Sequence, residues 1–188
     1  ANRLGGNSLL EAVVFGARAG EASAAYAKDT GAPDVPSNAA AETEGRIAEL
    51  LSRENGPRQG EIRDELSAVM QEKVGVFRED ATLREAKAKV DELKARFQGV
   101  VVDDKGKTFN TDLIHTIETG YLLDLADCMV TGAIARHESR GAHSRTDFPD
   151  RDDENWMKHT LAYADDGEIR LDYSEVTMTK YEPQVRTY

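Results

Sequence analysis

The fold is decided by the stretch LREAKAKVDELKARF, residues 83–97. Its apolar side chains recur at alternating intervals of three and four residues, at Leu83, Ala86, Val90, Leu93 and Phe97. This spacing places them along one face of an α-helix and leaves the charged side chains on the other. Such a seam needs apolar partners, so the stretch predicts one helix of a bundle.

Helical patterns of the same kind lie on both sides of this stretch. One stripe runs through Ile62, Leu66, Val69, Met70, Val74 and Phe77, and a shorter one through Ile47, Leu50 and Leu51. We expect the longer stripe to be buried in the bundle, with docking of a partner helix as the alternative. From Leu113 to Arg136 apolar residues occur on every face, which predicts a helix at the buried centre. Because the connections are short, we expect an antiparallel bundle and a mainly α fold.

The N-terminal part is predicted to be a separate helix. An alanine-rich pattern runs from Ser8 to Lys28, and Ser8 with Glu11 matches a capping box that begins the helix at Ser8. Glycine and proline then break the pattern. We therefore divide the chain into an N-terminal helical segment (residues 1–29), a linker (30–43) and a helical domain with a tail (44–188).

The tail has a different pattern. Residues 138–155 are rich in charge, glycine and proline, which predicts an irregular loop. Met157–Tyr163 and Ile169–Tyr173 alternate apolar and polar residues around an Asp-Asp-Gly turn, which indicates a small β-hairpin.

Composition limits the possible partners. The 188 residues carry 24 Lys and Arg against 35 Asp and Glu, a net charge of −11, which argues against nucleic acid or an anionic membrane surface. No apolar run reaches the roughly 20 residues of a membrane span, so we expect no direct membrane insertion. The single Cys128 indicates a reducing compartment and is expected to be a buried small hydrophobe. Because the chain begins with alanine, we expect a processed protein or part of a longer one.

Chemistry is concentrated in the segment NRLGGNSLLE, residues 2–11. Gly5 and Gly6 before a helix start allow a ligand to approach the backbone closely, and the helix N-terminus favours negative charge. Arg3 adds a guanidinium that can grip a carboxylate with two hydrogen bonds. From the residues alone, both an anion site and a purely structural turn remain open.

This segment resembles a motif of the flavoprotein subunits of succinate dehydrogenase and fumarate reductase. A second segment, ESRGAHSRTDFPDRDDENW at residues 138–156, resembles the tail of the same family, and the final VRTY at 185–188 is similar too. The resemblance implies that Arg3 binds a carboxylate of the dicarboxylate substrate, and that Ser8 and Leu9 contact the flavin of FAD. It also implies that residues 1–29 end the FAD-binding domain. L-aspartate oxidase, which shares a motif similar to the first, is the enzyme alternative.

The resemblance further implies an oxidoreductase that converts succinate to fumarate and passes electrons through an iron–sulfur subunit to quinone. Membrane anchor subunits would hold it at the cytoplasmic face of the membrane. No G-x-G-x-x-G turn occurs in the chain, and the family's remaining catalytic residues belong to segments before Ala1. We therefore assign no catalytic residue here and expect the isolated chain to be inactive. A helical interaction module without chemistry is the alternative from another class.

Other candidate residues have mainly structural interpretations. His115, His137, His143 and His159 lack metal-ligand spacing, so we expect no metal site. In the loop, Arg140, Arg145 and Arg151 alternate with Glu138, Asp147 and Asp152, which favours an ion-pair network that fastens the loop to the bundle; a cation site, a solvated loop and contact with the flavin domain stay open. Trp156 is expected to be a core anchor.

Overall fold

The computed structural model describes residues 6–165, 167–181 and 183–184. These residues form six helices, a small antiparallel hairpin and a two-residue parallel pair, as the predicted mainly α fold requires. They fall into two compact units that divide between Ser52 and Arg53. The predicted domain bounds at residues 29 and 43 stay a prediction.

The first unit contains helices α1 (Asn7–Thr30) and α2 (Ala41–Ser52). The predicted capping box is wrong, because α1 begins at Asn7 and its N-cap is Gly6 with φ of 75°. Ser8 therefore lies inside the first turn, and glycine is favoured at the cap because it adopts this left-handed conformation without strain. Asn7 and Glu11, one turn apart, are joined by a side-chain hydrogen bond of 3.3 Å.

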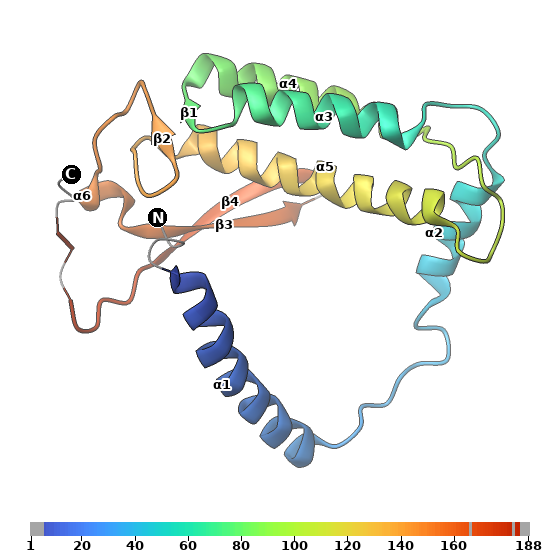
Figure 1. Ribbon diagram of the computed structural model, residues 1–188, viewed down its shortest axis with the longest axis horizontal. Helices are drawn as coiled ribbons and strands as arrows, with labels where there is room; N and C mark the ends of the chain where they lie inside the picture. Colours follow the sequence, from blue (N-terminus) through green and yellow to red (C-terminus); the bar gives the residue numbers. More distant parts are fainter. Residues whose placement is uncertain (1–5, 166, 182, 185–188) are drawn as a thin grey trace. The chain divides into compact units, whose positions relative to one another are not determined.

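The second unit is built on three long helices, α3 (Gln59–Lys73), α4 (Asp80–Phe97) and α5 (Thr111–Ala135), with short connections. Figure 1 shows them side by side, each running opposite to the one before it, so the predicted antiparallel bundle is confirmed. The predicted seam of α4 is also confirmed, since Leu83, Ala86, Val90 and Leu93 are fully buried.

Two expectations about the bundle are wrong. Phe77 does not belong to the α3 stripe, because α3 ends at Lys73 and Phe77 lies in strand β1 (Phe77–Arg78), where it is 73% exposed. Helix α5 is not buried on all sides: its exposed large apolar residues are Ile114, Tyr121, Leu122, Leu125 and Met129. A bundle of three helices covers only part of each helix, so apolar composition alone does not guarantee burial.

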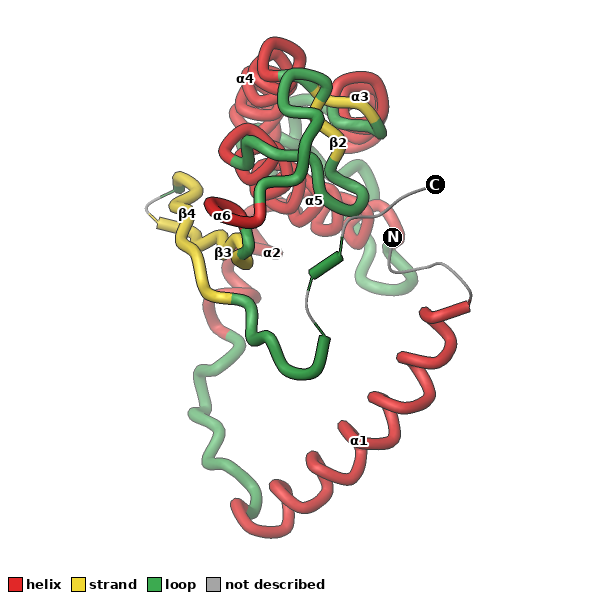
Figure 2. Tube along the Cα trace, turned by 90° about the vertical axis from the view of Figure 1, so that its left-hand side faces the viewer, coloured by secondary structure: helices red, strands yellow, loops and turns green. Residues whose placement is uncertain are grey.

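The tail follows the predicted pattern. Residues 138–156 form a loop that contains strand β2 (Ser144–Arg145) and the single turn α6 (Asp153–Trp156). Strands β3 (Lys158–Asp165) and β4 (Glu168–Glu175) then pair in an antiparallel hairpin, visible in Figure 2. The hairpin contacts α5, and β1 pairs in parallel with β2, which connects the loop to the turn between α3 and α4.

Gly56 is expected to be indispensable for the second unit. A Cβ atom at this position would overlap the carbonyl oxygen of Gly99 and lie 2.9 Å from Val101 Cγ2. Because the obstacle is backbone, Gly56→Ala should lower the free energy of unfolding by about 2 kcal/mol or more, measured by urea denaturation. The control Gly60→Ala, in α3 with open space around its Cβ, should raise it by up to about 1 kcal/mol. Equal effects of the two substitutions would contradict the expected clash.

The described helices and side chains show neither a membrane-spanning segment nor a metal-binding cluster. None of these helices is both long enough and apolar enough to cross a membrane. Over the same ranges, no group of three or more His, Cys, Asp or Glu side chains is arranged to hold a metal ion. Cys128 is half-buried rather than buried, because it lies beside the uncovered face of α5.

Candidate functional site in an arginine-rich loop

The site residues predicted from the sequence lie at the start of the chain. Arg3 falls outside the described residues. Ser8 and Leu9 occupy the first turn of α1, where both are exposed and Leu9 is 76% exposed. Among the described residues beyond its chain neighbours, no atom lies within 4 Å of a Cβ built on Gly6. The first turn of α1 is therefore open to a ligand on the side of Gly6, although nothing in the structure assigns one.

A second cluster, which the sequence indicated only in outline, centres on Glu138. This carboxylate is fully buried at the end of α5. Its Oε1 accepts hydrogen bonds from Arg136 at 2.6 Å and Arg140 at 2.8 Å, and its Oε2 accepts from Arg140 and from the Asp152 backbone N–H, both at 3.0 Å. Burial alone would raise the pKa of Glu138, but these hydrogen bonds outweigh it and hold the pKa below its ordinary value.

Arg136 links this cluster to the hairpin through hydrogen bonds. Its guanidinium donates to the backbone oxygens of Trp156 at 3.0 Å and Lys158 at 2.7 Å, and to Thr160 Oγ1 at 2.9 Å. It also lies over the Trp156 ring, 5.1 Å from the ring centre. One arginine therefore joins the end of α5, the buried carboxylate and the first strand of the hairpin.

The Arg145 side chain caps the C-terminal end of α5 by donating hydrogen bonds to its last carbonyl groups. It is fully buried and donates from Nη1 to the carbonyl oxygens of Ala133 at 2.8 Å and Ile134 at 3.3 Å. A cation is favoured there because the last carbonyls of a helix carry partial negative charge. Two further hydrogen bonds of 2.7 Å join Arg145 to Asp147 and hold the pKa of Asp147 well below its ordinary value. Asp147 also accepts the backbone N–H of Asp80 at the start of α4, 2.9 Å away.

His143 has a defined protonation state. Its Nδ1 lies 2.9 Å from Arg78 Nη1 and its Nε2 lies 3.1 Å from the Arg136 carbonyl oxygen. A guanidinium only donates and a carbonyl only accepts, so Nδ1 is the acceptor and Nε2 carries the hydrogen of a neutral ring. Burial, with the nearby arginine charges, lowers the pKa of His143 and favours this neutral form. The role of His143 is therefore structural.

The predicted ion-pair network is confirmed for Arg140 with Glu138 and for Arg145 with Asp147. Arg151 pairs instead with Asp153 at 2.7 Å, because Asp152 caps α6 by accepting the Asn155 N–H at 3.0 Å. The sequence interpretation missed Arg78 and Arg136. Both could have been proposed from the sequence, because each arginine directly follows an apolar segment that contacts the loop.

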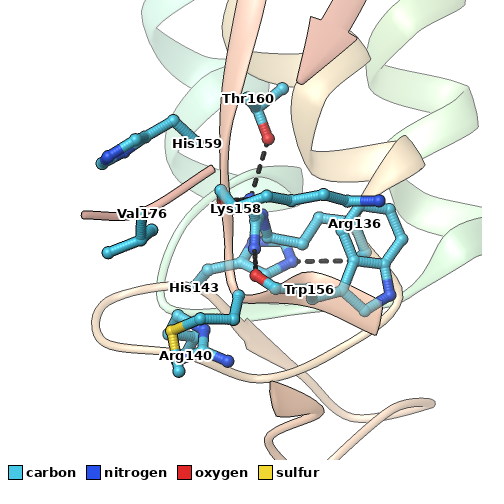
Figure 3. Close-up of a pocket in the computed structure, with 9 residues that line it drawn as sticks. Arg136, Arg140, His143, Trp156, Lys158, His159, Thr160 and Val176 are labelled. Carbon is cyan, nitrogen blue, oxygen red and sulfur yellow. Dashed lines mark hydrogen bonds between the residues drawn. The ribbon is translucent and has the colours of Figure 1, made fainter. Parts of the chain in front are cut away.

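A cavity of about 470 Å³ opens between the loop and the hairpin. Figure 3 shows Arg140 and His143 from the loop, with His159 and Val176 from the hairpin segment. The Lys158 side chain extends toward the Trp156 ring (Figure 3), and the remaining lining residues are Arg136, Trp156, Met157, Lys158 and Thr160. The cavity belongs wholly to the second unit.

Arg145 provides a test of how the loop is fastened. Lysine keeps the charge but loses the planar group that bonds Asp147 twice and also reaches two carbonyls, so Arg145→Lys should lower the free energy of unfolding by about 2 kcal/mol. The control Arg170→Lys, with a side chain that is 51% exposed and a nearest carboxylate oxygen 3.5 Å away, should change it by less than about 0.5 kcal/mol. Thermal denaturation followed by circular dichroism measures both. Equal stability of the two variants would contradict the role of Arg145.

Comparison with known proteins assigns the bundle and its arginine-rich loop to a helical domain of flavoproteins. The family model described as fumarate reductase flavoprotein C-term matches residues 63–188. The chain therefore belongs to the family of C-terminal domains of fumarate reductase and succinate dehydrogenase flavoprotein subunits.

Individual relatives agree with this assignment. The fumarate reductase flavoprotein subunit of Haemophilus influenzae is 44% identical over 193 residues, covering 100% of this chain and 32% of the relative. The succinate dehydrogenase flavoprotein subunit of Rickettsia conorii is 38% identical, covering 98% of this chain and 31% of the relative. A solved structure of E. coli quinol fumarate reductase superposes with a TM-score of 0.89 at 42% identity, covering 97% of this chain and 32% of that chain. The chain thus spans about a third of the length of these relatives.

Proposed function

We propose that this chain forms the C-terminal part of an FAD-dependent flavoprotein subunit that interconverts succinate and fumarate. In the proposed assembly, electrons pass between the flavin and quinone through an iron–sulfur subunit. Anchor subunits hold the assembly at the cytoplasmic face of the membrane. Membership of the family and the names of the relatives support this proposal. One similar solved structure is a quinol–fumarate reductase with menaquinol molecules.

The observation that carries the proposal is the exposure of helix α1. Over 24 residues this helix has no buried residue, although it contains Leu9, Leu10, Val13, Val14 and Phe15, all exposed. An isolated helix of mixed composition is marginally stable in water and usually depends on packing of its apolar face. We propose that α1 packs against the flavin-binding part of the subunit, which corresponds to the family motif at residues 2–11.

The start of α1 fits the edge of a flavin. Gly6 has no side chain and open space beside it, and Ser8 and Leu9 are exposed in the first turn. When bound, FAD supplies the hydride acceptor or donor. We propose that Ser8 and Leu9 hold the pyrimidine edge, where the helix N-terminus favours the negative charge of the reduced form. Arg3 holds a substrate carboxylate so that the reacting carbon faces the flavin.

Two names remain for the parent enzyme. Relatives at 42–44% identity are named fumarate reductase, and relatives at 37–38% are named succinate dehydrogenase. Both names describe the same interconversion, and direction depends on the quinone and on redox potentials. We therefore propose succinate dehydrogenase or fumarate reductase as the activity.

Absorbance spectroscopy between 300 and 550 nm tests the proposal first. The purified 188-residue chain should show no flavin bands and no activity, because it supplies one edge of the site. Co-expression with the flavin-binding part of a related subunit should restore flavin absorbance and turnover of succinate or fumarate. Turnover of L-aspartate instead would assign the oxidase. Failure to associate with any flavin-binding partner would favour a helical interaction module without chemistry.

A further inference from the structure

The cavity between the loop and the hairpin has an unusual charge for this protein. The chain has a net charge of −11, yet the described residues that line the cavity include Arg136, Arg140 and Lys158 and no carboxylate. Glu138, which is fully buried, and Asp153, which is 2.6 Å from Arg140, neutralise part of this charge, but neither lines the cavity. Arg136 already donates from both terminal nitrogens to Glu138, to two backbone oxygens and to Thr160, so Arg140 is the arginine of the lining that can still donate to a ligand.

The Arg140 guanidinium is fixed by carboxylates, and its Nη1 has no strong hydrogen-bond acceptor among the described residues. Its Nε and Nη2 are occupied by Glu138 at 2.8 and 3.0 Å and by Asp153 at 2.6 Å. Its Nη1 has a thioether contact, to Met157 Sδ at 3.9 Å. A thioether is a weak acceptor, so the N–H groups of Nη1 retain most of their capacity to donate. Because the carboxylates fix the guanidinium, little side-chain entropy is lost when a ligand binds.

Lys158 adds a positive charge beside the cavity and has no carboxylate partner among the described residues. Its Nζ lies 4.7 Å from the centre of the Trp156 ring and 4.3 Å from that of the Tyr173 ring. Aromatic faces hold a cation in position without neutralising its charge. On the opposite rim stands the exposed imidazole of His159 (Figure 3).

We propose that this cavity binds a small anion, through a carboxylate or phosphate group that accepts hydrogen bonds from Arg140 Nη1. A cavity of about 470 Å³ accommodates such an anion together with water. The site lies in the second unit and needs no flavin, so it is independent of the function proposed above. The helical domain would then bind an anion separately from the flavin site.

Trp156 provides a direct readout, because it is the one tryptophan in the chain and lines the cavity. Its fluorescence should change saturably when the full chain is titrated with sodium phosphate or sodium succinate at ionic strength held constant with sodium chloride. We expect a dissociation constant of about 1 mM or below for at least one of them. Saturation by phosphate alone or by succinate alone identifies the group that the site accepts. A linear response to both overturns the proposal.

Matched variants locate the binding. Arg140→Met should weaken binding at least about tenfold, a loss typical of a charge-assisted hydrogen bond. Arg84→Met removes an arginine from the exposed face of α4, where its partner is Asp80, and should leave binding unchanged. Equal affinity of the two variants would overturn the site.

If Arg140→Met fails to fold, amide NMR on the unmodified chain locates the bound anion instead. Shifts caused by phosphate or succinate should concentrate in residues 156–160 and at Val176. Shifts spread over α3 and α4 would show non-specific binding and reject the cavity.

Discussion

Replacing Arg3 with alanine in the assembled flavoprotein should lower kcat/KM about 100- to 1000-fold, because a charge-assisted hydrogen-bond pair to the substrate is lost where charge develops. Flavin content should stay unchanged, since Arg3 is proposed to contact the substrate carboxylate and not the cofactor. Initial rates with fumarate and a reduced dye give kcat/KM. The ratio of flavin to protein absorbance gives the flavin content.

Arg18→Ala is the matched control for Arg3. Arg18 lies on helix α1 with its guanidinium 5.9 Å from the centre of the Phe15 ring, and it is exposed. Its removal should leave kcat/KM within a factor of about two. Arg3→Lys should recover part of the loss, because lysine keeps the charge but lacks the fork that bonds a carboxylate twice. Near-normal turnover in Arg3→Ala would reject Arg3 as a substrate ligand.

The bundle could be predicted because the helical spacing of its apolar residues is visible within each single segment. The α4 residues Leu83, Ala86, Val90 and Leu93 repeat at helical spacing, and all four are fully buried. The hairpin was predictable for the same reason, since strand alternation and the turn residues lie within one short segment. Periodicity identifies the face of a helix that must be covered.

Periodicity does not identify how many neighbours a helix has. Helix α5 is apolar on every face, yet Tyr121, Leu125 and Met129 are exposed, while the charged Asp127 is buried. Asp127 accepts a hydrogen bond from Lys94 at 2.7 Å and lies 3.3 Å from Lys87, and both lysines belong to α4. Such pairs between helices depend on how the helices meet, which no single segment encodes.

The loop shows that the sequence pattern likewise does not predict the geometry of a site. Alternating charges at residues 138–152 indicated a network, but not that Glu138 would be fully buried or that Arg136 would join it to the hairpin. At the other end, Ser8 was placed at the cap from its residue type, although the backbone of Gly6 decides where α1 begins.

Glu138→Gln should destabilise the domain more than the other loop substitutions, by about 3–5 kcal/mol at pH 7, because it removes the fully buried carboxylate that the half-buried Arg136 and Arg140 share. The amide has the same shape, but its NH₂ group faces N–H donors and its single oxygen cannot serve Arg136, Arg140 and the Asp152 backbone together. Glu154→Gln, exposed on α6, should change stability by less than about 0.5 kcal/mol. Urea denaturation of the 188-residue chain measures both.

The pH dependence distinguishes this charge effect from a packing effect. The pKa of Glu138 in the folded chain lies below its ordinary value of 4.5, so its carboxylate contributes stability that is present above that value. The contribution is lost as pH falls from 4.5 through the folded-state pKa, because protonation then removes the charge in both states. The stability difference between the native chain and Glu138→Gln should therefore be constant near neutral pH and shrink below pH 4.5. A difference that stays constant under acid would mean that the amide disturbs packing, and that the arginines of the loop do not depend on the charge of Glu138.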